Sequence, residues 1–325
     1  MKLQYNVLCI DDNISSLNRI KGNFKEYNEK VGIKVEFQDI NAKIKATESP
    51  EAFRSRITEE ISKKFSDNEQ IFDFILVDLH LGPTEPEDFN GSDVINIIRD
   101  SHTLYRPIVF YSAGDPASYD TAKKQLDDAT RESGISGRSI FIVARDELSH
   151  FLSEIAQEMH KEEHKINRVR GLLMDQVSEL DARIINAIAT KKLWDDVQKN
   201  KREKVTKEFK ERINSQKNAS INIFEITENM NYDQIQEYII SNPRSVNTFT
   251  KAKVLREMLR HINHLKEYGV VLSQGINGEN SLNAIRNSYG HQIADELTKT
   301  HDTAKCKLIR EESRRQVDSI KKVSE

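Results

Sequence analysis

The stretch YNVLCIDDN, residues 5–13, is an apolar run that ends in two adjacent aspartates, Asp11 and Asp12. Its length and its content of Val, Ile and Leu predict a buried β-strand. Two carboxylates at the tip of such a strand repel each other, and burial raises the cost, so a cation or a shared proton normally accompanies them. The stretch therefore predicts a strand with a charged site at its end.

Four further apolar runs follow at intervals, and helical patterns separate them. The runs are IKVEF (33–37), FDFILV (72–77), PIVFY (107–111) and SIFIV (139–143), and the helical patterns cover 15–27, 50–65, 92–102 and 118–132. Strands that are apolar throughout and alternate with helices are typical of a parallel sheet covered on both faces. Residues 1–150 are therefore predicted to form an α/β domain with a doubly wound, five-stranded parallel sheet.

Polar residues follow three of these runs, where a doubly wound sheet binds its ligands. Asp11 and Asp12 follow the first run, Asp78 the third and Ser112 the fourth. Three carboxylates at one edge form an oxygen-rich pocket that suits Mg²⁺. Asp78 would then be a nucleophile toward a phosphoryl group, and Ser112 would hydrogen-bond a phosphate oxygen. Taken singly, each acidic residue can instead be a turn former or a helix cap.

In this combination of residues, the first half of the chain resembles the receiver domain of two-component response regulators. The family's acidic pair matches Asp11 and Asp12, its phosphoacceptor matches Asp78, and its hydroxyl residue matches Ser112. The resemblance implies a flavodoxin-like fold and Mg²⁺-dependent transfer of phosphate from a histidine kinase to Asp78. It also implies that a backbone carbonyl near His80 completes the metal shell.

Two features depart from the family's pattern. The family places a lysine after the last strand, but here the sequence reads FIVARDEL, so Ala144 or Arg145 takes that place. Arg145 would keep the charge that binds the phosphate, although arginine is longer and planar. The loop at 79–91 is also longer and more acidic than usual. We expect a phosphorylatable site, and a degenerate receiver is the alternative.

Composition narrows the class of protein without naming a partner. The chain has 325 residues, enough for two domains, and its formal net charge of −3 favours no particular ligand. Its two cysteines, Cys9 and Cys306, are far apart and not in metal spacing, which favours a reducing compartment. No apolar run approaches the length of a membrane span. We therefore expect a cytoplasmic protein that does not bind membranes.

The second half of the chain is helical in pattern. Apolar residues recur at steps of three or four from Ile166 to Ile188, namely Ile166, Val169, Leu173, Val177, Leu180, Ile184 and Ile188. We interpret 151–190 as a signalling helix that pairs with a second copy in a homodimer, and packing inside its own bundle is an equal alternative. Residues 191–325 are predicted to form an all-α effector domain, with a helix at 250–268, a loop at 269–280, a helix at 281–301 and a frayed tail around 311–325.

The segment 189–220 is locally basic, with ten Lys and Arg against five Asp and Glu. Such an excess could contact the phosphate backbone of RNA, although a solvated helix face is the more common explanation. The sequence shows no helix-turn-helix with a basic recognition helix, so we expect no specific DNA binding.

The motif IRNSYGH, residues 285–291, holds groups that can act on a phosphodiester. His291 can move a proton near neutral pH, and Arg286, beside Asn287, can hold a phosphate by two parallel hydrogen bonds. Residues five apart are rotated by about 140° on a helix, so convergence requires a helix start or a second chain. The alternative is that Arg286 forms a surface salt bridge and His291 caps a helix.

The spacing of these three residues resembles that of HEPN domains, all-helical dimers with ribonuclease activity in many toxins and antiviral proteins. The resemblance implies that Arg286, Asn287 and His291 are catalytic. The sequence as a whole thus predicts a response regulator that is phosphorylated on Asp78 and controls a metal-independent endoribonuclease. The alternative is a phosphorylation-controlled dimerisation or docking module without nuclease activity.

Overall fold

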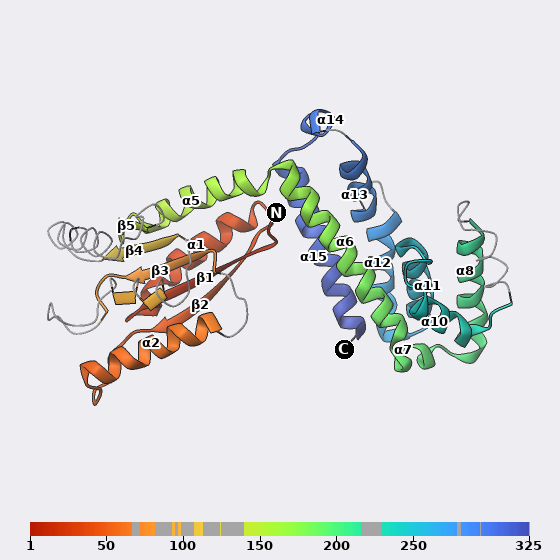
Figure 1. Ribbon diagram of the computed structural model, residues 1–325, viewed down its shortest axis with the longest axis horizontal. Coiled ribbons are helices and arrows are strands. Elements are labelled where there is room, and N and C mark those ends of the chain that lie inside the picture. Colours follow the sequence, from red (N-terminus) through yellow and green to blue (C-terminus); the bar gives the residue numbers. More distant parts are fainter. Residues whose placement is uncertain are drawn as a thin grey trace. The chain divides into compact units, whose positions relative to one another are not determined.

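The computed structural model describes residues 1–66, 72–81, 93–94, 97–98, 107–112, 124, 140–215, 229–277, 281–292 and 294–324. The chain divides into two compact units, Lys2–Glu162 and Glu163–Glu325 with Met1, which we name the sheet unit and the helical unit (Figure 1). Most of the predicted helices at 92–102 and 118–132, and most of the acidic loop at 79–91, lie outside the described residues.

The sheet unit is built on five parallel strands in the order β2-β1-β3-β4-β5. The strands are β1 (Gln4–Asp11), β2 (Lys34–Asn41), β3 (Phe74–Asp78), β4 (Ile108–Ser112) and β5 (Ile140–Ala144). This order is that of flavodoxin-like folds, so the predicted fold class is confirmed. The order of the strands reverses between β1 and β3, which places a crevice beyond the carboxyl ends of these two strands.

Helices cover both faces of the sheet, as the continuous apolar strands predicted. On one face, α1 (Asn18–Glu29) and α5 (Leu148–Glu163) contribute Phe24, Leu152 and Ala156 to a buried cluster with alternate strand residues. On the other face, α2 (Pro50–Ser66) contributes Phe53 and Ile57 to a second cluster. Figure 1 shows α1 and α5 on the side of the sheet opposite to α2.

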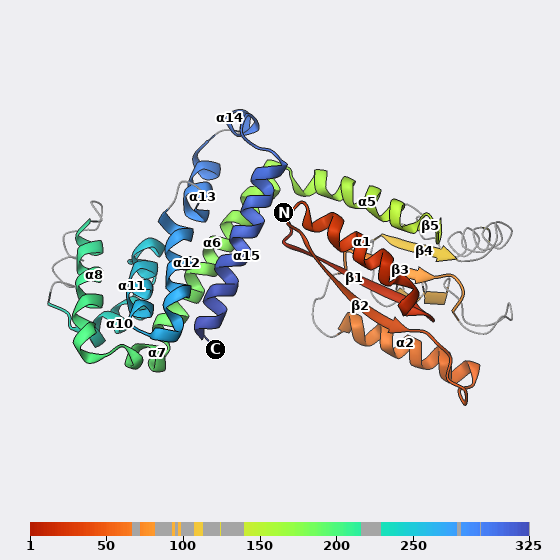
Figure 2. The same cartoon turned by 180° about the vertical axis from the view of Figure 1, so that it is seen from behind.

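The helical unit is all-α in its described residues. Its helices are α6 (Ile166–Ala189), α7 (Lys191–Asp196), α8 (Arg202–Ser215), α10 (Tyr232–Ser241), α11 (Thr248–Arg260), α12 (Lys266–Asn277), α13 (Leu282–His291), α14 (Ala294–Thr298) and α15 (Thr303–Ser324). The long helices α6 and α15 run side by side (Figure 2). Trp194 is buried in the core of this unit, and its ring stacks on Tyr232 with centroids 4.1 Å apart. No helix among the described residues is long and apolar enough to span a membrane.

The apolar seam on α6 faces its own bundle. Six of its seven residues, from Val169 to Ile188, are at most 8% exposed, and α6 packs on α10, α11, α13 and α15. The seam therefore packs inside its own bundle, which was the alternative, and pairing of the segment 151–190 with a second copy stays a prediction. The continuous helical pattern is also interrupted, because α5 ends at Glu163 and α6 begins at Ile166.

Three predictions in the second half are wrong. The helix predicted at 250–268 ends at Arg260, and most of the loop predicted at 269–280 belongs to α12. The glycines that suggested a loop allow close helix packing instead: a Cβ at Gly275 would lie 2.1 Å from the Nε2 atom of Gln316 on α15. The predicted frayed tail lies within the 22-residue α15, which buries Ile309, Ile320 and Val323.

Candidate functional site

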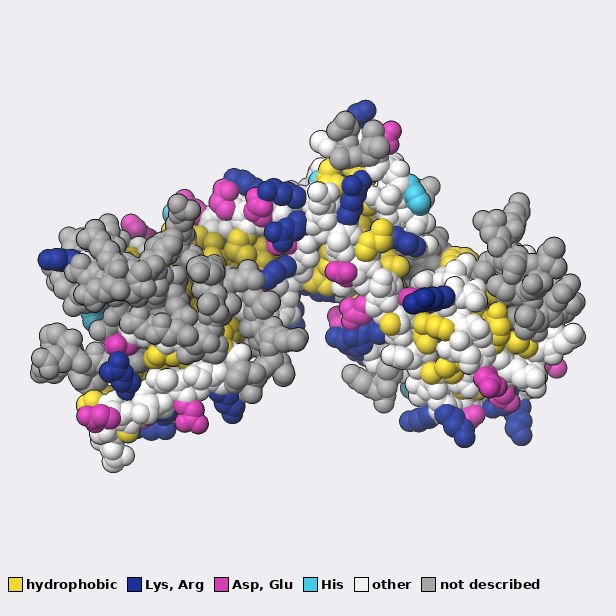
Figure 3. All heavy atoms as spheres, viewed as in Figure 1, with side chains coloured by type: hydrophobic (Ala, Val, Ile, Leu, Met, Phe, Trp, Pro, Cys, Tyr) yellow, Lys and Arg dark blue, Asp and Glu magenta, His cyan; other side chains and the backbone are white. Residues whose placement is uncertain are grey.

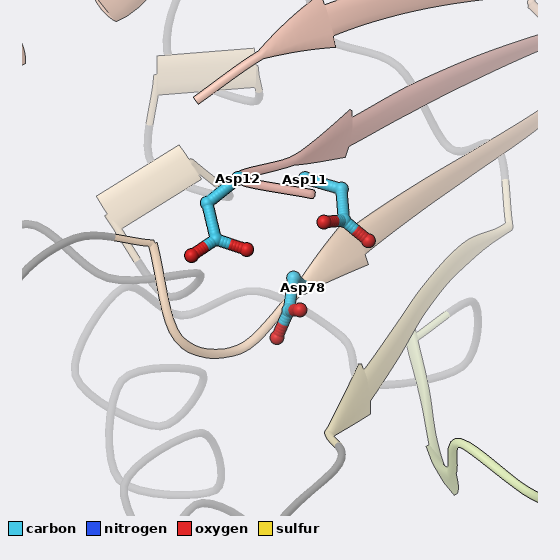
Figure 4. Close-up of side chains that lie close together, drawn as sticks. All are labelled: Asp11, Asp12 and Asp78. Atoms are coloured by element: carbon cyan, nitrogen blue, oxygen red, sulfur yellow. The ribbon is translucent and has the colours of Figure 1, made fainter. Parts of the chain in front are cut away.

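Three carboxylates meet at the carboxyl edge of the sheet. Asp11 and Asp78 are the last residues of β1 and β3, and Asp12 follows directly. One oxygen from each carboxylate lies within 4.8 Å of the others, and Figure 4 shows the three side chains gathered at the strand ends. Because carboxylate oxygens at this spacing are the donors that hard cations prefer, this cluster could hold a metal ion.

Asp11 is fully buried and accepts three hydrogen bonds. Its Oδ1 atom accepts the backbone N–H of Asn13 at 2.5 Å, and its Oδ2 atom accepts the Tyr111 hydroxyl at 2.6 Å and Arg145 Nη2 at 3.1 Å. Burial, and then the charge of Asp11, raise the pKa of Tyr111 well above its usual value, so the hydroxyl keeps its proton and donates. The orientation of Asp11 is thus fixed by the fold.

Asp78 and Asp12 have perturbed pKa values. The pKa of Asp78 is raised to about 7, first by burial and also by Asp11 and Asp12, against the lowering effects of the His80 N–H and of Arg145. That N–H donates to Asp78 Oδ1 at 3.0 Å. Burial and the neighbouring Asp11 likewise raise the pKa of Asp12. Burial, the first cause of both shifts, disfavours the charged forms of Asp78 and Asp12, and a cation bound between the carboxylates would favour those forms.

Arg145, the first residue after β5, supplies the positive charge nearest the cluster. Its guanidinium bonds Asp11 and the Ser16 hydroxyl, lies 4.0 Å from Asp78 Oδ2, and sits over the ring of Tyr111 with Cζ 5.5 Å from the centroid. Between the two residues that the sequence left open, Arg145 and not Ala144 brings charge to this edge.

Ser112 ends β4 beside the carboxylates. It is 3% exposed, and its Oγ atom lies 3.2 Å from His80 Nδ1. An open pocket of about 980 Å³ adjoins this point, and its lining includes Ser16, Ser112 and Arg145. A hydroxyl, a guanidinium and an open approach therefore lie next to the three carboxylates.

Sequence reasoning missed the role of Tyr111. The sequence places Tyr111 at the end of the apolar run PIVFY, where it could equally serve as core packing, and the ring is indeed buried. In the sheet register, however, Tyr111 stands opposite Asp78, and its hydroxyl reaches Asp11 on the strand beyond. Aligning the carboxyl ends of the three strands would have placed the tyrosine in this row, because laterally paired residues point to the same face.

The residues of the predicted nuclease motif all lie on α13 but not together. Arg286 is partly buried and donates from Nη2 to Asn283 Oδ1 at 2.8 Å, whereas Asn287 and His291 are exposed. Five positions along this helix rotate the direction of the side chain by about 140°. Arg286 and His291 therefore do not share one face of α13 within a single chain.

The basic segment at 189–220 is partly neutralised within its own helix. In α8, Arg212 bonds Glu208 at 2.8 Å and Lys207 lies 3.8 Å from Glu211, and the Arg202 guanidinium sits over the ring of Tyr232. On the face shown in Figure 3, positive and negative side chains are interspersed. These pairs favour a solvated helix face, and RNA binding by this segment stays a prediction.

Comparison with known proteins adds no relative to these observations. The sequence matches no model of a protein family and no curated protein. We therefore interpret the function of the chain from the geometry of two sites, the carboxylate cluster in the sheet unit and the predicted nuclease motif in the helical unit.

Proposed function

We propose that the sheet unit is a receiver domain in which Asp78 accepts a phosphoryl group from a histidine kinase in the presence of Mg²⁺. The observation that carries this proposal is the convergence of Asp11, Asp12 and Asp78 within 4.8 Å at the switch point of a flavodoxin-like sheet. Asp11 and Asp78 each accept the backbone N–H two residues on, as turn formers do. Such turns do not require three carboxylates side by side, so a ligand with positive charge is the simplest reason for the cluster.

The residues fit Mg²⁺, because the donor set is all oxygen and the carboxylates carry an excess of negative charge. Asp11, Asp12 and Asp78, with the carbonyl near His80, would hold the ion. When bound, Mg²⁺ would offset the charge that repels an incoming phosphoryl group. A carboxylate oxygen of Asp78 would attack phosphorus as the bond to the donor breaks, leaving an acyl phosphate.

Arg145 and Ser112 would receive the transferred group. The Ser112 hydroxyl would donate to a phosphoryl oxygen, and the Arg145 guanidinium would pair with another, in the role that lysine has in the family. To do so, Arg145 would exchange its hydrogen bond with Asp11 for one with the phosphoryl group. That local exchange would alter the surface of the sheet unit around β5 and provide the output signal.

The proposal is tested by labelling the full chain with ³²P-acetyl phosphate. We expect the wild type to be labelled with Mg²⁺ and not with EDTA, and Asp78→Asn to remain unlabelled. Asp146→Asn is the matched control, because Asp146 is exposed and lies beside Arg145 outside the carboxylate cluster. Labelling of Asp78→Asn to the level of the wild type would show that the phosphoacceptor is wrong.

As a second function, we propose that the helical unit is a metal-independent endoribonuclease of the HEPN type, acting as a homodimer. The observation that favours two copies is the placement of Arg286 and His291 on different faces of α13. One chain would then provide the arginine that holds the phosphate, and the other the histidine that moves the proton. Phosphorylation would control how the two copies meet.

Complementation separates this function from its alternative, a docking module. We expect Arg286→Ala and His291→Ala each to lose RNA cutting, and a mixture of the two to regain a fraction of it, because mixed dimers restore one intact site. Cutting by His291→Ala at the wild-type rate, or absence of cutting by the wild type with and without phosphodonor, would leave the docking module as the function.

A further inference from the structure

A hollow of about 440 Å³ in the helical unit lies apart from the carboxylate cluster. Asp181 of α6, Arg244 and Asn247 before α11, Lys251 of α11 and Arg286 of α13 contribute to its lining, with Pro243, Val246, Thr248, Phe249 and Asn283. Three segments that are distant in sequence thus converge on one concave surface. Its volume is in the range of small-molecule sites, roughly 300–1,000 Å³.

The lining carries an excess of positive charge. Arg244 is exposed, Arg286 is partly buried, and Lys251 is 1% exposed. Among the described residues of the lining, the single acidic one is Asp181, whose Oδ2 atom accepts Lys251 Nζ at 2.6 Å. Lys251 also donates to the backbone carbonyl of Pro243 at 3.0 Å, so it ties the loop before α11 to α6. Three cations against one carboxylate favour an anionic ligand.

Two polar atoms of the lining residues are buried without a hydrogen-bond partner. They are Nε of Arg286, a donor, and Oδ1 of Asp181, an acceptor. Leaving such a group unsatisfied costs roughly 1–3 kcal/mol, so buried polar atoms normally have partners. Both atoms lie beneath the accessible surface of the hollow, so they add an unmet donor and an unmet acceptor to its wall and are not contact points for a ligand.

The first turn of α11 also favours an anionic ligand. Thr248 and Phe249 are in the first turn of this 13-residue helix and line the hollow. The first N–H groups of a helix have no partner within the helix, and they carry the positive end of its dipole. In α11 the side chain of Asn247 accepts one such group, the N–H of Thr250. Arginine pairs with phosphate through two parallel hydrogen bonds, which makes phosphate the best match for these cations.

We propose that this hollow binds a phosphate monoester of the size of a nucleoside monophosphate, with the phosphate held by Arg244, Arg286 and the start of α11. The volume exceeds what a phosphate alone fills, so the hollow has room for the group to which the phosphate is attached. The site does not depend on phosphorylation of Asp78, but it shares Arg286 with the proposed nuclease site. It makes the helical unit responsive to a small molecule.

Isothermal titration of the full chain with AMP tests the site, with adenosine, inorganic phosphate and a short single-stranded RNA as comparison ligands. We expect AMP to bind at least tenfold more tightly than adenosine or phosphate. Arg244→Gln and Arg286→Gln should each weaken AMP binding at least tenfold. Arg260→Gln is the control, because Arg260 is the last residue of α11, is 64% exposed and pairs with Glu257. This variant should bind AMP as the wild type does.

Several results would overturn the proposal. They are a lack of AMP binding, equal affinity for adenosine or for inorganic phosphate, tighter binding of RNA than of AMP, and unchanged AMP affinity in both Arg244→Gln and Arg286→Gln. Arg244 is exposed in a loop, so Arg244→Gln keeps the test decisive even if the change at Arg286 disturbs the fold. Since binding is measured directly, it is independent of whether the chain cuts RNA.

Discussion

Arg145 is the residue on which the balance of charge at the sheet edge depends. It bonds one carboxylate of the cluster and lies 4.0 Å from another, so it offsets part of the negative charge of the buried aspartates. A lysine, with a compact ammonium group, could not bond Asp11 and Ser16 and cover the face of Tyr111 at the same time. Arginine at position 145 therefore makes hydrogen bonds that a lysine would not make, while the charge is the same.

At the residue scale, we expect the stability of the sheet unit without Mg²⁺ to fall as pH rises from about 4 to about 7. The raised pKa of Asp78 means that the native state keeps a proton that the unfolded chain has already lost. Between these pH values the unfolded state binds fewer protons than the native state. The free energy of unfolding therefore decreases by up to about 1.4 kcal/mol for each unit by which the pH rises. Thermal midpoints at several pH values, for the wild type and Asp78→Asn, measure the effect.

Asp78→Asn should flatten this dependence and raise the midpoint near neutral pH, because the amide needs no proton to remain neutral. Asp146→Asn, at an exposed position, should keep the wild-type slope. Equal slopes for the wild type and Asp78→Asn would contradict the assignment of the raised pKa to this carboxyl.

The three aspartates of the site were predictable because each follows an apolar run, and the ends of parallel strands meet at one edge of a sheet. The contact of Tyr111 with Asp11 required a further step, the alignment of the ends of β1, β3 and β4, which no single run contains. Whether Ala144 or Arg145 lies at the position next to the carboxylates likewise depends on the direction that the chain takes after β5, which the sequence does not show.

At the scale of the element, α12 shows where composition misleads. Glycine lowers helix propensity and normally predicts a break. In α12, however, Gly275 lies against Gln316 of α15, whose amide donates to the carbonyl of Val271 at 2.9 Å. A contact across 41 positions of sequence decides the conformation, so local pattern could not reveal it. The same limit applies to the seam on α6, where periodicity shows an apolar face but not its partner.

We expect Gly275→Ala to destabilise the helical unit by roughly 1–3 kcal/mol, in the range of overpacked cores. The added Cβ would lie 2.1 Å from Gln316 Nε2, and Gln316 is fully buried and hydrogen-bonded. Urea unfolding measures the loss.

Gly171→Ala in α6 is the matched control. A Cβ there meets nothing within 4 Å, so this change should stabilise the helix by up to about 1 kcal/mol. A stabilising effect of Gly275→Ala as well would show that α12 and α15 do not pack as closely as the structure has them.

At the scale of the whole molecule, the chain has two units with separate cores. The sheet unit buries one apolar cluster on each face of its sheet, and the helical unit buries a third around Trp194 and Leu255. The division follows Glu162, so α5 belongs with the sheet and α6 with the helices. Each unit thus has the buried apolar surface that independent folding requires.

We expect residues 1–162 alone to fold and to be labelled by acetyl phosphate as the full chain is. The covering helices α1, α2 and α5 lie within this segment, so no face of the sheet loses its cover. A cooperative thermal transition followed by circular dichroism would show folding. The shorter segment 1–147, which lacks α5, should fail this test because Leu148, Leu152 and Ala156 fill one face of the sheet.

The stacked Trp194 gives the molecule a built-in optical label. It is the chain's single tryptophan, and it is buried against Tyr232 in the helical unit. Emission excited at the red edge of the absorption band therefore comes from that unit alone, while the sheet unit remains dark. A shift of this emission toward longer wavelength would tell an observer, in unmodified protein, when the helices loosen and the indole meets water.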